Sequence, residues 1–240
     1  MRAAGIGNGK ERERMENGNG NAGGTRKNVI LDIDGTMWDA IPQIFAAWEA
    51  AFRKFPENHD LKISQELKMT CLGHTAPEIA EMFFPEVPEE RRLAFMKAAE
   101  ENEVRYLPDH PGMVYPGFNE AVRLLHEKGY GIYVVSNCQN GYVAVAVRAA
   151  GIEDIVRDSE WYARTKLPKS GSIKLLMERN GLKPEDCVYV GDIVNDEYAA
   201  HDAGIRFIHA AYGFGGADRP EAVIRTASEL PAAVASLFQP

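Results

Sequence analysis

Two aspartates, Asp32 and Asp34, close a short apolar run and are separated by a single isoleucine. The run, residues 29–33 (VILDI), has the length of a strand and consists largely of aliphatic and β-branched residues. Such runs are typical of strands buried on both faces of a parallel sheet. Because carboxylates at the mouth of a buried strand are costly without a compensating partner, this pair is a candidate for chemistry.

Polar side chains also end two later runs of strand length. Ser136 and Asn137 close residues 130–137 (YGIYVVSN), and the stretch GDIVND places Asp192 and Asp196 at and after the end of residues 187–192. Ligands of open parallel sheets bind outside the carboxyl ends of the strands. We therefore expect these side chains to converge on one edge of the sheet.

Converging carboxylates repel one another, and one of them would be forced to take up a proton. A hard cation with oxygen ligands removes that penalty. Mg²⁺ is such a cation, and it is commonly held by one or two carboxylates together with a phosphate oxygen. The predicted cofactor is therefore Mg²⁺.

With a metal in place, one aspartate can attack phosphorus as a nucleophile. An aspartate two residues further along an extended chain points to the same side, so it can act as general acid and then as general base. Gly35 allows the chain to leave the strand sharply, and Thr36 offers a hydroxyl to the phosphoryl oxygens.

The order of elements that must position these groups is also readable. Residues 41–111 are mostly helical: apolar residues follow helical spacing over 41–55, Thr75 and Glu78 form a capping box, and 88–106 is a charge-rich helix. From residue 116 onward strands alternate with helices. The fold class predicted is α/β, a doubly wound parallel sheet with an inserted all-helical domain.

The domain boundaries follow from this pattern. Residues 28–40 and 112–240 form the α/β core, and 41–111 form the helical insertion. Residues 1–27, rich in Gly, Asn and charge, are predicted to be a disordered tail.

Composition limits the class of partner. The net charge is −8; the first 27 residues hold six Lys or Arg and three Glu, which is +3, so the remaining chain carries −11. Such a body is a poor partner for nucleic acid, although a local cation can still bind a small anion. No apolar run is long enough to span a membrane, no secretory pattern opens the chain, and three well-separated cysteines fit a reducing cytoplasm.

The stretches DIDGT (32–36), VVSN (134–137), a downstream lysine and GDIVND (191–196) occur in this order. Together they resemble the haloacid-dehalogenase-like hydrolase superfamily. The helical block stands where the phosphoglycolate-phosphatase-like branch carries its cap domain. The resemblance implies a Rossmann-like core with a helical cap, Mg²⁺ as cofactor and phosphoryl chemistry.

The resemblance also implies roles for the acidic residues. Asp32 is the nucleophile and a metal ligand. Asp34 is the acid and base, and its backbone carbonyl is a metal ligand. Asp192 is the third protein ligand. Asp196 either contacts the metal through a water molecule or contacts the residues that bind the metal.

For the phosphoryl group, the resemblance implies contacts from Ser136 and from the backbone of Asn137. It also implies a lysine that neutralises the phosphoryl charge and the nucleophile. In RTKLPKSGSIKLL three lysines compete for this role. Lys169 is favoured because it precedes a helix, Lys166 is second, and Lys174, inside that helix, is expected to be solvated.

Residues 71–78 (CLGHTAPE) are predicted to be the cap loop that reaches the substrate, with Gly73 and His74 as contacts. A surface or capping role for His74 remains the alternative.

The function predicted is a Mg²⁺-dependent phosphomonoester hydrolase that acts on a small phosphorylated metabolite through an aspartyl-phosphate, as a monomer or homodimer. The alternatives are a phosphomutase and a non-catalytic binding protein on the same fold. The carboxylate at Asp34 argues against dehalogenases, phosphonatases and ion-pumping ATPases, which lack it. Thr36 lowers the mutase option, because β-phosphoglucomutase-like members usually carry valine there.

Overall fold

The computed structural model describes residues 26–58, 61–71 and 73–239. Within this range the main sheet has six strands in the order β5-β4-β1-β6-β7-β8, and all neighbours are parallel. Their bounds are β1 Asn28–Leu31, β4 Gly131–Ser136, β5 Val156–Trp161, β6 Cys187–Gly191, β7 Arg206–Ala210 and β8 Ala222–Ile224. The predicted doubly wound parallel sheet is confirmed, with the first strand in its centre.

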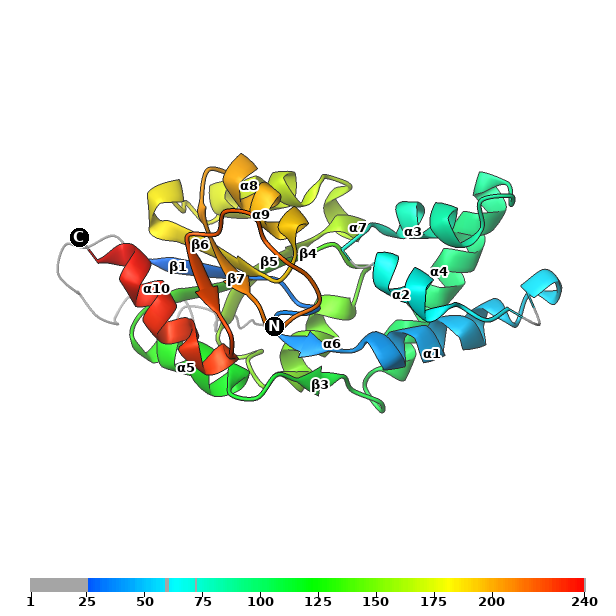
Figure 1. The fold of residues 1–240 in the computed structure, drawn as a ribbon, viewed down its shortest axis with the longest axis horizontal. Helices are drawn as coiled ribbons and strands as arrows, with labels where there is room; N and C mark the ends of the chain where they lie inside the picture. Colours follow the sequence, from blue (N-terminus) through cyan, green and yellow to red (C-terminus); the bar gives the residue numbers. More distant parts are fainter. Residues whose placement is uncertain (1–25, 59–60, 72, 240) are drawn as a thin grey trace, which may run out of the picture.

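Helices cover both faces of this sheet (Figure 1). Helices α5 (Phe118–Glu127), α6 (Tyr142–Ala149) and α10 (Leu230–Phe238) pack on one face, and α8 (Lys169–Arg179) and α9 (Val194–Asp202) pack on the other. In β1, Val29 and Leu31 belong to the first layer and Ile30 to the second. Both faces of the strand are thus buried, which explains its unbroken apolar run.

The helices within residues 41–106 form a separate unit at one end of the molecule (Figure 1). They are α1 (Ile41–Phe52), α2 (Gln65–Thr70), α3 (Ala76–Phe83) and α4 (Glu89–Tyr106). This unit has its own apolar core, in which aromatic rings such as those of Phe52, Phe84 and Phe95 meet edge to face. The fold class with an inserted all-helical unit is therefore confirmed. No described helix is long and apolar enough to cross a bilayer.

A two-stranded antiparallel ribbon joins the two connections between this unit and the core. It pairs β2 (Trp38–Asp39) with β3 (Met113–Val114), so that Trp38 faces Val114 and Asp39 faces Met113. This ribbon was not predicted, because two residues are too few to show the alternation typical of a strand.

Most predicted elements differ from the observed ones only at their ends. The helix expected over 41–55 ends at Phe52, and the helix expected over 88–106 begins at Glu89. The Thr75–Glu78 pair does open a helix, since the Glu78 carboxylate accepts the backbone N–H of Thr75 at 2.7 Å.

Other elements were not predicted at all. They are β5, the short helix α7 (Tyr162–Thr165), β8, α10, and the 3-10 turns Pro56–Asn58, Pro184–Asp186 and Ala227–Glu229.

The predicted tail lies mostly outside the described residues. Of its described part, Lys27 forms an ion pair with Asp186 at 2.5 Å, and its carbonyl accepts the N–H of Gly131. Lys27, the last residue of the predicted tail, thus contacts the core.

Candidate active site

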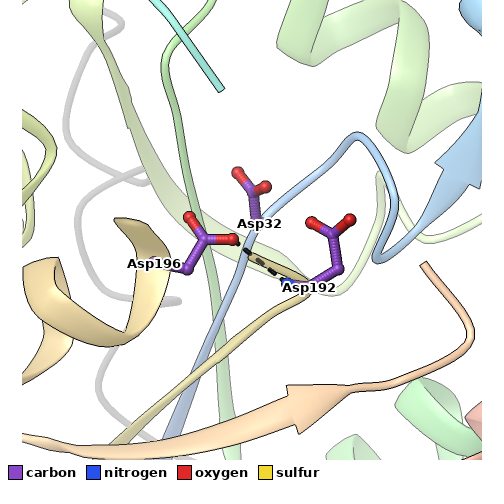
Figure 2. A group of neighbouring side chains, drawn as sticks. All are labelled: Asp32, Asp192 and Asp196. Carbon is purple, nitrogen blue, oxygen red and sulfur yellow. Dashed lines mark hydrogen bonds between the residues drawn. The ribbon is translucent and has the colours of Figure 1, made fainter. Parts of the chain in front are cut away.

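Three buried carboxylates meet at the carboxyl end of the central strands. Asp32 follows β1, Asp192 follows β6, and Asp196 lies in the first turn of α9. Each offers an oxygen within 4.8 Å of the oxygens of the other two. Figure 2 shows these side chains gathered around a common space. The convergence expected of the strand ends is thus present for these three residues.

Two glycines leave room for the Asp192 carboxylate. A Cβ on Gly35 would lie 1.9 Å from Asp192 Oδ2, and a Cβ on Gly213 would lie 2.6 Å from the same atom. Gly35 also has a φ of +77°, which L-residues with a side chain adopt only at a cost. The backbone N–H of Phe214 donates to Asp192 Oδ2 at 2.7 Å and fixes its direction.

Lys169 is the buried cation of this cluster. Its Nζ lies 3.1 Å from Asp32 Oδ1 and 2.5 Å from Asp196 Oδ1. The other oxygen of Asp196 accepts the backbone N–H groups of Asp192 and Ile193, at 3.1 and 3.3 Å. Asp196 therefore positions both Lys169 and the turn that carries Asp192.

Burial and mutual repulsion weaken the acidity of the cluster. Burial raises the pKa of Asp32 to about 7; Lys169 opposes this, while Asp196 adds to it. Burial, followed by the charges of Asp196 and Asp32, raises the pKa of Asp192 to about 8. A divalent cation among the oxygens would remove this repulsion, so the donor set fits Mg²⁺.

Asp34 lies beside the cluster but is held differently. Its Oδ1 accepts hydrogen bonds from Tyr142 Oη at 2.5 Å and from Trp38 Nε1 at 3.1 Å. Burial raises the pKa of Asp34 to about 6, although both hydrogen bonds oppose the shift. Because both donors reach Oδ1, Oδ2 remains available for a proton transfer.

These carboxylates face a cavity of about 890 Å³, part of which is open to solvent. Most of the predicted substrate contacts line it: Ser136, Asn137, Gly73 and His74. The side-chain amide of Asn137 donates to the Gly73 carbonyl at 3.0 Å and so bridges the core and the loop between α2 and α3. His74 lies 3.6 Å from the Glu78 carboxylate, so the capping alternative for this residue also has a contact.

Three residues considered from the sequence do not reach the cavity. Thr36 is fully buried outside its lining, and its hydroxyl has no hydrogen-bond partner among the described residues. The phosphoryl contact of this hydroxyl stays a prediction, and reaching the cavity would require the Thr36 side chain to leave its buried position. Lys166 and Lys174 are both exposed, and Lys166 Nζ lies over the Tyr162 ring.

Sequence reasoning missed the acidic residues that α4 contributes to the cavity, Glu100 and Glu103. The sequence predicts residues 88–106 only as a charge-rich helix and assigns none of its residues to the site. A signal was nonetheless present: Phe95, Met96 and Ala99 form its buried stripe, and Glu103 continues that stripe one turn further.

The sequence model of the haloacid dehalogenase-like hydrolase family matches residues 29–210. A phosphoglycolate phosphatase from Haemophilus influenzae (strain 86-028NP) is 26% identical over 203 residues, covering 78% of this chain and 87% of that protein.

Two solved structures show the likeness in fold. A predicted phosphoglycolate phosphatase from Haemophilus somnus 129pt superposes with a TM-score of 0.72 at 21% identity, over 89% of this chain and 98% of that chain. A β-phosphoglucomutase from Clostridium difficile gives a TM-score of 0.71 at 15% identity, over 88% and 98%.

Proposed function

The chain belongs to the haloacid dehalogenase-like hydrolase family, and we propose that it is a Mg²⁺-dependent phosphatase of small phosphomonoesters. The observation that carries the proposal is the pair Asp32 and Asp34. One carboxylate contacts Lys169, and the other is hydrogen-bonded on a single oxygen, both at the floor of one cavity. The relatives named phosphoglycolate phosphatases support the same reaction class.

In the proposed first step, an Asp32 oxygen attacks phosphorus and the bond from phosphorus to the alcohol oxygen breaks. Asp34 donates its proton to the departing oxygen. A pKa of about 6 suits this exchange, since a group with a pKa near the working pH can both hold and release a proton. Lys169 offsets the negative charge on Asp32 and on the phosphoryl group.

In the second step, Asp34 takes a proton from water, and the water oxygen attacks phosphorus. The bond between Asp32 and phosphorus breaks, and inorganic phosphate leaves. Asp32, Asp192 and the backbone of Asp34 would hold Mg²⁺, which supplies charge neutralisation for the phosphoryl oxygens. Ser136 and the backbone of Asn137 are proposed to hold the same oxygens.

The two aspartates should fail at different steps when each is changed to asparagine. Asp32→Asn removes the attacking oxygen, so no phosphoryl-enzyme forms. Asp34→Asn keeps the nucleophile, and with p-nitrophenyl phosphate, whose leaving group needs little protonation, the first step survives in part. The second step then stalls, and turnover falls by about 10²–10⁴-fold.

Mass spectrometry of acid-quenched protein measures the adduct. We expect phosphate on Asp32 in the Asp34→Asn variant and none in the Asp32→Asn variant. Asp202→Asn, on the exposed end of α9, is the matched control and should behave like the native protein. An adduct on another residue, or full phosphate release in excess EDTA, would overturn the proposal.

A further inference from the structure

The helical unit adds two further carboxyl groups to the lining of the cavity. Helix α4 contributes Glu100 and Glu103, which form an acidic wall of the cavity. Among the described residues that line the cavity, Lys169 is the one lysine or arginine, and it is already paired with Asp32 and Asp196. The part of the cavity that α4 lines therefore holds two carboxyl groups and no lysine or arginine among its described lining residues, although the exposed Lys166 lies nearby.

Glu103 is held in place as a hydrogen-bond acceptor. Its Oε1 accepts the side-chain amide of Gln139 at 2.6 Å, and its Oε2 accepts the indole N–H of Trp48. The residue is 2% exposed. A carboxylate has about four lone-pair sites, so each oxygen can accept one more donor. Two fixed N–H donors, one on each oxygen, match the ionised form of the side chain.

Glu100 lies one turn earlier on the same helix and is half-buried. Among the described residues, none donates a hydrogen bond to its carboxylate. Lys166 is near enough to lower its pKa, but that lysine is exposed and does not line the cavity. Burial is the larger effect and raises the pKa of Glu100 to about 7 and that of Glu103 to about 8. A cation bound between them would relieve this cost.

Aromatic rings complete the wall. Phe45, Trp48, Tyr142 and Tyr162 all line the cavity. The faces of such rings attract cations, most strongly when the cation is partly removed from water. Carboxylates and aromatic rings together form a surface that favours an ammonium group and disfavours a carboxylate.

We propose that the alcohol part of the substrate carries a positive charge, as in the phosphate ester of an amino alcohol, and that Glu100 and Glu103 select it. This inference rests on the proposed phosphatase function. It departs from the carboxylate-bearing substrate in the names of the relatives. Above the pKa of about 8 that burial gives Glu103, a carboxylate in this position would meet a like charge across a buried surface, which is strongly unfavourable.

Three phosphate esters of nearly equal size test the charge preference. O-phosphoethanolamine ends in an ammonium, propyl phosphate in a methyl, and 2-phosphoglycolate in a carboxylate. We expect kcat/KM to fall in that order, by about tenfold at each step, the scale that partly desolvated charge contacts produce. Hydrolysis of p-nitrophenyl phosphate measures the phosphatase reaction with a substrate whose alcohol part carries no charged end group.

Charge-removing variants test which residues carry the preference. Glu100→Gln and Glu103→Gln should each lower the kcat/KM ratio of the ammonium ester to propyl phosphate by about tenfold. Glu101→Gln, the neighbouring exposed residue paired with Arg105, should leave this ratio unchanged. If Glu103→Gln misfolds because its amide opposes the Trp48 and Gln139 donors, Glu100→Gln still decides the outcome.

The outcomes separate the two proposals. Suppose the native protein hydrolyses p-nitrophenyl phosphate but prefers 2-phosphoglycolate, or hydrolyses the three esters equally well. Either result overturns this inference and leaves the phosphatase function in place. A ratio unchanged in both variants likewise overturns the assignment of the two glutamates. A protein that hydrolyses none of the four esters with Mg²⁺ overturns the phosphatase function, and this inference with it.

Discussion

Lys169 is the residue whose role the sequence left most open, since three lysines stood within nine positions. The structure buries Lys169 to 8% exposure against Asp32 and Asp196, whereas Lys166 and Lys174 are exposed. A buried ammonium is stable only with compensating charge, and here two carboxylates provide it. The same contact places the ammonium beside the proposed nucleophile.

Lys169→Met should therefore lower kcat with p-nitrophenyl phosphate by about 10²–10³-fold, the effect of removing one preorganised charge donor from an active site. Lys166→Met, the same change three positions earlier on the surface, should change kcat less than about threefold. Steady-state kinetics with saturating Mg²⁺ measure both. The reverse ranking of the two variants would reassign the catalytic lysine.

At the scale of elements, the sequence predicted the groups at the carboxyl ends of the central strands but not the strands at the edges of the sheet. Parallel strands bring their carboxyl ends to one edge, so Asp32 could be expected beside Asp192 and Asp196 although they come from two separate stretches. The edge strand β5, by contrast, is charged: its Glu160 is buried only because Arg164 and Arg179 reach it. The two arginines that balance the charge of Glu160 come from two helices, α7 and α8. The sequence of β5 itself therefore shows no alternation of apolar and polar residues that would predict a strand.

The sequence holds one signal for the acidic wall, the apolar stripe of α4 that Glu103 continues, and the charge of this helix obscures that signal. Glu103 is buried by partners from α1 and from the loop after β4, which are distant in sequence. A charge-rich helix normally presents such residues to solvent. The partners in the folded structure show that this glutamate lies inside.

The turn that follows β1 depends on Gly35 for two separable reasons, its positive φ and its contact with Asp192. Gly35→Ala should lose about 1–2 kcal/mol of stability from the left-handed backbone and, in addition, displace the Asp192 carboxylate. We expect the stabilisation by Mg²⁺, measured as a rise in Tm, to disappear along with turnover.

Gly204→Ala is the matched control, since Gly204 has a φ of +78° and no atom within 4 Å of an added Cβ. It should lose similar stability but keep the Mg²⁺-dependent rise in Tm. Equal responses of the two variants to Mg²⁺ would mean that the Asp192 carboxylate does not depend on this close approach.

At the scale of the whole molecule, the active site lies where two separately packed units meet. The helices α1–α4 share an apolar core of their own. The sheet and its flanking helices form two further apolar cores, one on each face of the sheet. Described side-chain hydrogen bonds between the units include Asn137 to Gly73 and Gln139 to Glu103. The covalent connections are tied by the short β2–β3 ribbon.

This construction favours movement of the helical unit as one body. Its internal core resists deformation, whereas a few polar contacts and a two-residue ribbon can change at small cost. We therefore predict that the unit acts as a lid that closes over a bound phosphoryl group and excludes bulk water. Tungstate, a phosphate mimic, should bind at the Asp32 end with Mg²⁺ and draw the lid onto the core.

Hydrogen–deuterium exchange with and without tungstate and Mg²⁺ measures this closure. Protection should rise in residues 73–76 and 137–142, which the hydrogen bond from Asn137 to Gly73 joins. It should change little inside α1 and α4, whose apolar side chains pack mainly within the lid. Asp32→Asn, which weakens the tungstate site, serves as the control and should show no added protection. Equal protection throughout both units would indicate general stabilisation by the ligand. No change at either cavity segment, despite bound tungstate, would show that the lid is already fixed in the position seen here.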